Sequence, residues 1–207
     1  MPHRLVIFDL DGTLADSFPW FVRVLNGVAD EFKFRRIADN EIEELRCCGP
    51  RELLARLDVP LWKVPAIARY MRRLKTQHMR DIPLFPGVRE MLLTLARKNL
   101  TLALVSSDHE ANVRRQLGAQ TAALFAYFDC GASLFGKAAK FKRVTKRSAV
   151  ASTETIAIGD EIRDIEAARS AGIACGLVSW GYADPSVLRS HNPDFMFESM
   201  AEITERL

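Results

Sequence analysis

Short apolar runs alternate with helical patterns along most of this chain. Apolar residues at helical spacing predict helices over residues 88–99, 109–118 and 164–172, the last two ending at a glycine. Strands are predicted in RLVIFD, LTLALVSS, AYFDCGASL, ETIAIGD, IACGLVSW and DFMFES. Continuous apolar strands are typical of a parallel sheet that is covered on both faces. The alternation therefore predicts an α/β fold, with a doubly wound parallel sheet.

One region departs from this alternation. Residues 17–82 contain helical patterns and no convincing strand, and Gly49-Pro50, Pro60 and Pro65 separate these patterns. The alternation resumes after Pro83. We therefore expect an all-helical insertion at 17–82 in a core formed by residues 1–16 and 83–207.

Composition narrows the class of protein. With 207 residues, 48% of them hydrophobic, the chain can bury a substantial core, and its net charge of +3 gives no reason to expect nucleic acid as a partner. No apolar run is long enough for a membrane span. The four cysteines lack metal-binding spacing, so we expect reduced thiols and a cytoplasmic protein. The basic stretch from Lys63 to Arg80 is either a solvated helix face or a rim that attracts anions, and the oligomeric state stays open.

Polar side chains follow four of the predicted strands. Ligands of open α/β sheets bind beyond the carboxyl ends of the strands, so groups placed there are expected to meet in one crevice. In chain order these groups are Asp9 and Asp11, then Ser106 and Ser107, then Lys137, and finally Asp160 and Asp164.

Together these groups suit phosphoryl transfer. Asp9 can act as a nucleophile and, with Asp160, supply the carboxylate oxygens that Mg²⁺ prefers. The Ser106 hydroxyl, backbone N–H groups of the following loop and the Lys137 ammonium can hold phosphate oxygens. Asp11 is then available as general acid and base. The expected substrate is a small phosphorylated metabolite.

Each group has a structural explanation when it is taken alone. DGT forms good turns, Ser106 and Ser107 can cap a helix, and GDEIRD can simply lead into one. Their joint order favours a catalytic site. A signalling receiver-like module would use similar groups around a phosphorylated aspartate, and the long helical insertion argues against it.

At these residues the sequence resembles the haloacid dehalogenase-like hydrolase superfamily. The resemblance rests on DLDGT, on Ser106 after the second strand, on the later Lys137 and on GDEIRD. It implies a Rossmann-like core, a helical cap inserted after the first motif, and an aspartyl-phosphate intermediate on Asp9. The dehalogenase branch lacks the second aspartate of the first motif, so the presence of Asp11 fits an alkoxide leaving group.

The resemblance also implies roles for particular residues. Mg²⁺ would bind the Asp9 carboxylate, the Asp11 backbone carbonyl and Asp160, while Asp164 would orient waters or Lys137. Gly12 and Ser107, which replaces a frequent Asn, would contact substrate. Within the superfamily the layout resembles phosphoglycolate phosphatases, through LFGKAAK, VSWGY and GPRELLARL. A phosphosugar mutase of the same superfamily is a further alternative.

Overall fold

A six-stranded parallel sheet forms the centre of the protein. The computed structural model describes residues 3–132 and 136–207, so the first two residues of the LFGKAAK stretch lie outside the described residues. The strand order is β3-β2-β1-β4-β5-β6, and every pairing is parallel. The strands are β1 (Leu5–Phe8), β2 (Thr101–Val105), β3 (Tyr127–Asp129), β4 (Thr155–Gly159), β5 (Ala174–Val178) and β6 (Phe195–Phe197). All of the predicted strands form, and the α/β prediction is confirmed.

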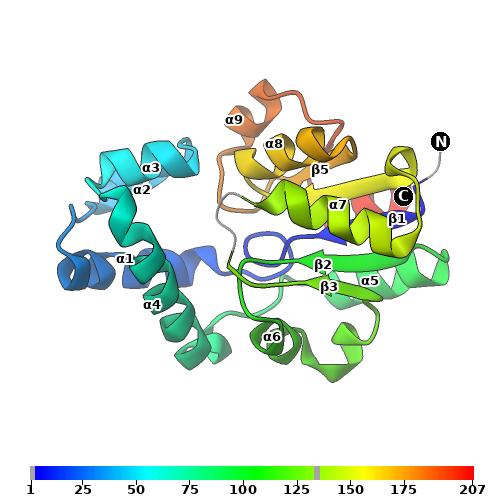
Figure 1. Ribbon diagram of the computed structural model, residues 1–207, viewed down its shortest axis with the longest axis horizontal. Helices are drawn as coiled ribbons and strands as arrows, with labels where there is room; N and C mark the ends of the chain where they lie inside the picture. The colour runs from blue at the N-terminus through cyan, green and yellow to red at the C-terminus, as the bar shows by residue number, and fades with distance from the viewer. Residues whose placement is uncertain (1–2, 133–135) are drawn as a thin grey trace.

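Helices cover both faces of this sheet. Figure 1 shows α7 and α8 on one face and α5 and α6 on the other. Side chains of β1 alternate between the faces, since Val6 and Phe8 join one buried cluster and Leu5 and Ile7 the other. The helices are α5 (Val88–Arg97), α6 (Glu110–Ala122), α7 (Lys137–Ser148), α8 (Ile162–Ala171), α9 (Pro185–Ser190) and α10 (Met200–Arg206).

Two predicted helix ends can be compared with the structure. Gly172 adopts φ 69° and ends α8, as the sequence predicts. Gly118 also has a positive φ, 74°, but helical hydrogen bonding resumes beyond it and α6 continues to Ala122. The first helical segment of α6 therefore ends at Gly118, as the sequence predicts, and a second short segment follows it across a kink.

The segment between β1 and β2 begins with the predicted helices. We call residues 17–82 the helical insertion; it contains α1 (Phe18–Phe32), α2 (Ile42–Arg46), α3 (Pro50–Arg56) and α4 (Val64–Gln77). Figure 1 shows it at the end of the sheet where β1 leads out into α1. Among the described residues, no helix combines the length and apolar character needed to cross a membrane.

A tight turn connects β1 to the insertion. The N–H groups of Leu14 and Ala15 both donate to the Leu10 carbonyl, at 2.9 and 2.8 Å. This turn follows directly after Asp9, and β2 and β4 are the strands on either side of β1. Loops that follow β1, β2 and β4 are therefore brought together at one edge of the sheet.

Candidate active site

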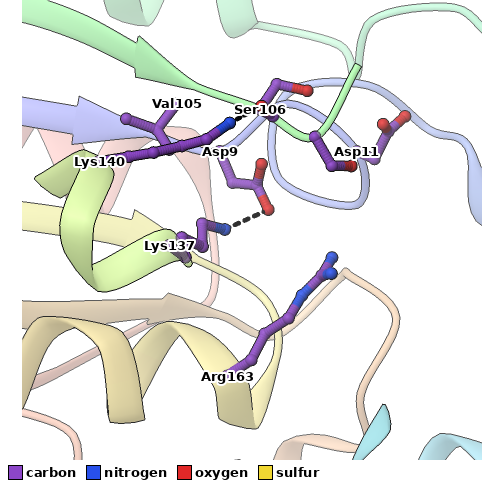
Figure 2. A pocket seen from close by; sticks show the side chains of 8 residues that line it. Asp9, Asp11, Val105, Ser106, Lys137, Lys140 and Arg163 are labelled. Atoms are coloured by element: carbon purple, nitrogen blue, oxygen red, sulfur yellow. Dashed lines mark hydrogen bonds and ion pairs between the residues drawn. The ribbon is translucent and has the colours of Figure 1, made fainter. Parts of the chain in front are cut away.

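Asp9 follows β1 and lies in the middle of this edge. Its side chain is buried, and its Oδ2 lies 2.6 Å from Lys137 Nζ at the start of α7. Its Oδ1 accepts a hydrogen bond from the Leu10 N–H at 2.8 Å. Burial raises the pKa of Asp9, and the charge of Lys137 opposes this rise. Figure 2 shows Lys137 and the other side chains around this carboxylate.

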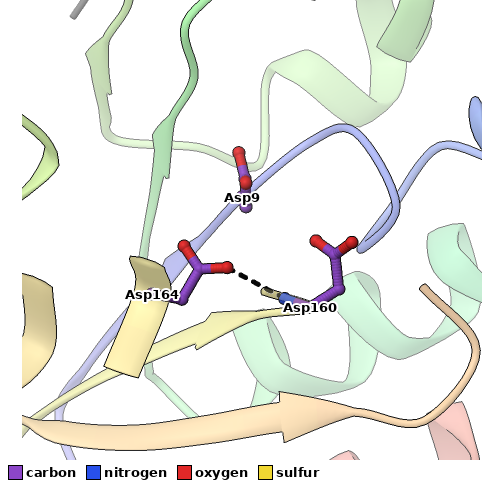
Figure 3. Close-up of side chains that lie close together, drawn as sticks. All are labelled: Asp9, Asp160 and Asp164. Atoms are coloured by element: carbon purple, nitrogen blue, oxygen red, sulfur yellow. Dashed lines mark hydrogen bonds between the residues drawn. The ribbon is translucent and has the colours of Figure 1, made fainter. Parts of the chain in front are cut away.

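Asp9, Asp160 and Asp164 form an acidic cluster, which Figure 3 shows. One carboxylate oxygen from each lies within 4.8 Å of the others. Asp160 accepts hydrogen bonds from Thr13 Oγ1 and from the Tyr182 N–H, both at 2.8 Å. Burial, followed by the charges of nearby carboxylates, raises its pKa well above the ordinary value. A divalent cation between Asp9 and Asp160 would offset this repulsion, so the donor set fits a hard cation.

Asp164 has a different position in this cluster. Its Oδ1 accepts from Lys137, and its Oδ2 accepts from the N–H groups of Asp160 and Glu161 at 3.0 Å each. Burial would raise the pKa of Asp164, but the charges of Lys137 and Arg163 outweigh burial and lower it. Because both oxygens already accept hydrogen bonds, Asp164 is better placed to hold Lys137 than to bind a cation directly.

Two glycines make room for the Asp160 side chain. A Cβ on Gly12, whose φ is +78°, would lie 2.0 Å from Asp160 Oδ2, and a Cβ on Gly181 would lie 2.2 Å from Asp160 Cβ. Any larger residue would displace the carboxylate. The N–H of Gly12 donates to the Ala15 carbonyl at 2.9 Å, so this N–H is already occupied.

A pocket opens beside Asp9 toward the loop after β2. It is lined by Asp9, Asp11, Val105, Ser106, Ser107, Lys137, Lys140 and Arg163. The Ser106 hydroxyl accepts from the Asp108 N–H at 3.1 Å, which leaves its own hydrogen free to donate. His109, and neither serine, occupies the N-cap position of α6, so a capping role does not account for Ser106 and Ser107. The structure thus brings together the candidates that follow β1, β2 and β3.

Lys140 is a pocket residue that the sequence analysis missed. Its Nζ donates to the carbonyls of Ser106 and Gly131 at 2.6 and 2.7 Å. It therefore ties the loop after β2 to the loop after β3. Its position one helical turn after Lys137 is the signal that could have identified it.

Asp11 points away from the acidic cluster and toward the helical insertion. Lys75 Nζ, at the end of α4, lies 2.7 Å from the Asp11 carboxylate and 3.4 Å from Asp108 Oδ2. Burial would lower the pKa of Lys75, but Asp11 and Asp108 outweigh burial and raise it. One of the two interpretations of the basic stretch that contains Lys75 was a solvated helix face. Its 5% exposure contradicts that interpretation for this residue.

Arg163 is the second basic residue that sequence reasoning missed. Figure 2 shows it extending from the start of α8 toward the pocket. Burial disfavours its charge, but Glu161 and Asp9 outweigh burial and raise the pKa of Arg163. Its place inside GDEIRD, between the predicted site residues Asp160 and Asp164, was the available signal.

This fold and this arrangement of carboxylates, lysine and serine define a hydrolase of the haloacid dehalogenase-like class. The family model described as haloacid dehalogenase-like hydrolase matches residues 6–178. The chain therefore belongs to this family, and the resemblance drawn from its motifs is confirmed.

Named relatives narrow the comparison. The chain is 29% identical over 203 residues to phosphoglycolate phosphatase of Synechococcus elongatus, covering 98% of this chain and 96% of that protein. It is 30% identical to phosphoglycolate phosphatase of Xanthomonas campestris, covering 86% of this chain and 84% of that protein.

Solved structures agree on the fold. A haloacid dehalogenase-like hydrolase of Streptococcus pneumoniae superposes with a TM-score of 0.81 at 19% identity, covering 99% of this chain and 98% of that one. CbbY of Rhodobacter sphaeroides, in complex with phosphate, superposes with a TM-score of 0.73 at 21% identity, covering 97% of this chain and 96% of that one.

Proposed function

We propose that the protein is a Mg²⁺-dependent phosphomonoesterase that works through an aspartyl-phosphate on Asp9. One observation carries this proposal: a buried carboxylate at the end of β1 lies against Lys137 and close to Asp160, at the base of a pocket lined by serine hydroxyls. The family and the phosphatases among its relatives support it.

Mg²⁺ would be held by the Asp9 and Asp160 carboxylates and the Asp11 backbone carbonyl. Bound there, the cation would neutralise the carboxylates and polarise the phosphoryl group. Asp164 keeps Lys137 beside Asp9, so the ammonium can share charge with a transferring phosphoryl group.

The reaction proceeds in two displacements at phosphorus. An Asp9 carboxylate oxygen bonds to phosphorus as the ester oxygen leaves, and Asp11 gives that oxygen a proton. Ser106 donates its hydroxyl hydrogen to a phosphate oxygen, and the backbone N–H of Ser107 completes the cradle. Water then attacks phosphorus and transfers a proton to Asp11, which regenerates the Asp9 carboxylate and releases phosphate.

The proposal extends to domain organisation and location. Residues 17–82 act as a cap over a core of residues 1–16 and 83–207, and the substrate is a small phosphorylated metabolite, with phosphoglycolate as the leading candidate. Four free cysteines suit a cytoplasmic enzyme.

Phosphate release tests this function. Purified protein is assayed on a panel of phosphate esters with Mg²⁺ and with EDTA. We expect release with Mg²⁺ only, and Asp9→Asn is expected to lower it by about 10⁴-fold or more, because no other group can carry the phosphoryl. Asp30→Asn, at an exposed position of α1, serves as the control.

Three outcomes would contradict the proposal. If the Asp9→Asn variant released phosphate at nearly the wild-type rate, Asp9 would not be the nucleophile. An isomeric phosphosugar formed without net phosphate release would identify the phosphosugar mutase alternative instead. Accumulation of a phospho-protein that persists for seconds would identify the receiver-like alternative.

A further inference from the structure

The space next to the Asp9 pocket must hold the part of the substrate that is not phosphate. A large cleft between the helical insertion and the core borders Asp11, Lys75, Ser107 and Arg163, and its other walls are mostly apolar side chains of the insertion. Because Arg163 lines both this cleft and the Asp9 pocket, it stands where the two spaces meet. The following inference rests on the proposed phosphatase function.

The three lysines of this region already have anionic or carbonyl partners. Lys137 binds Asp9 and Asp164, and Lys75 binds Asp11 and Asp108. Lys140 is occupied by backbone carbonyls. A second anionic group on the substrate would therefore have to be matched by another cation.

Arg163 has unused hydrogen-bonding capacity. Its Nη2 pairs with Glu161, while its Nε is buried and has no hydrogen-bond partner among the residues that the structure describes. A guanidinium carries five N–H donors in a fixed plane. Figure 2 shows this group pointing from α8 toward the side of the pocket that holds Asp9 and Asp11. A buried donor without a partner is costly unless a ligand completes it.

Arg72 shows the same feature on the opposite wall. It lies on α4 one turn before Lys75, lines the same cleft, and has a buried Nε without a hydrogen-bond partner in the described part of the chain. The neighbouring Arg73 is different, because it is exposed and stacks over Tyr70 at 5.0 Å from the ring centroid. Arg73 is not part of the cleft lining.

We propose that Arg163 and Arg72 form a second anion subsite that binds the carboxylate of a short phosphorylated acid. A planar guanidinium matches a carboxylate with two parallel hydrogen bonds. Since Arg163 borders the Asp9 pocket itself, a short carbon chain joins the two anionic groups. An uncharged ester of the same size offers neither guanidinium an anionic partner, and this difference creates the selectivity.

A matched pair of esters tests the subsite. Phosphoglycolate and ethyl phosphate have the same chain length and differ in one carboxylate, and the readout is the ratio of their kcat/KM values. We expect Arg163→Met to lower this ratio by about 10- to 100-fold, mainly through the KM for phosphoglycolate, because a charge-assisted contact is lost. Arg163→Lys keeps the charge without the planar fork and is expected to lower the ratio less than Arg163→Met.

The contribution of Arg72, on the helical insertion, is tested with the same ratio of kcat/KM values. Arg72→Gln is expected to lower the ratio by about 3- to 30-fold, and Arg73→Gln should leave it unchanged. An unchanged ratio in both Arg163→Met and Arg72→Gln, with both esters slowed equally, would overturn the subsite and leave the phosphatase intact. Absence of phosphate release from every ester by the wild-type protein would instead contradict the proposed function.

Discussion

The core and the helical insertion bury their side chains in different ways. The core helices α5 and α8 each bury several residues, whereas α2 and α3 bury none, and the only buried residue of α4 is Lys75. The apolar side chains of the insertion mostly line the cleft above the site. The insertion has a small buried cluster of its own, formed by Leu25, Ile37, Leu57 and Val59, but α2, α3 and α4 contribute little buried apolar surface and line the cleft instead.

Apolar and polar contacts join the two regions. Trp20 of α1 packs into a core cluster, and Arg46 donates to the carbonyls of Gly181 and Tyr182 at 3.1 Å each. Lys75 reaches Asp11 of the site. Because the polar contacts end at Asp11 and on the loop that holds Gly181 and Tyr182, the position of the insertion and the geometry of the site are linked.

The largest expected difference between the core and the insertion is the loss of unfolding free energy when a leucine is shortened to alanine. Leu104→Ala removes a fully buried side chain from β2 and should cost about 2–5 kcal/mol of unfolding free energy. Leu54→Ala, at a half-buried position of α3, should cost about 1 kcal/mol or less, since less apolar surface is buried there. Urea unfolding followed by circular dichroism measures both. Equal losses would show that the insertion is packed as tightly as the core.

The second prediction concerns the ion pairs between Lys75 of the insertion and Asp11 and Asp108 of the core. Lys75→Met leaves Asp11 and Asp108 without their cation and should cost about 1.5–3 kcal/mol, because the Asp108 carboxylate stays buried. Lys63→Met removes a lysine whose Nζ donates to the Phe32 carbonyl at 2.7 Å inside the insertion, and should cost about 0.5–1.5 kcal/mol.

Thermal unfolding with circular dichroism gives both values, and phosphate release is measured in parallel. A neutral or stabilising Lys75→Met variant would show that the insertion is not held to the core through Asp11.

The contrast between the core and the insertion also explains which features could be predicted from the sequence. Strands such as Leu5–Phe8 are continuous apolar runs, so their burial follows from composition, and the aspartates that follow them could be placed from strand order alone. The position of Lys75 depends on how the insertion packs against the core. No local pattern distinguishes a lysine that points into a site from the solvated lysines next to it.

The sequence also could not predict the structural surroundings of two glycines, Gly12 and Gly118. Gly12 could be placed in a turn, but its close approach to Asp160 joins positions that lie far apart in the chain. The helix end predicted at Gly118 is present as a kink, and the short helical segment that continues α6 to Ala122 was not predicted.

The smallest effect compares two glycines that have open space around them. A Cβ on Gly27 in α1 or on Gly118 in α6 would meet nothing within 4 Å, and only Gly118 has a positive φ, +74°. Gly27→Ala should therefore raise the unfolding free energy by about 0.5–1 kcal/mol, because alanine restricts the unfolded chain and suits a helix. Gly118→Ala should lower it by about 1 kcal/mol, because alanine is strained at that φ. Urea unfolding midpoints of both variants, measured side by side with the wild-type protein, give the sign of each change in unfolding free energy. A lower unfolding free energy in Gly27→Ala would mean that α1 is not a regular helix in solution.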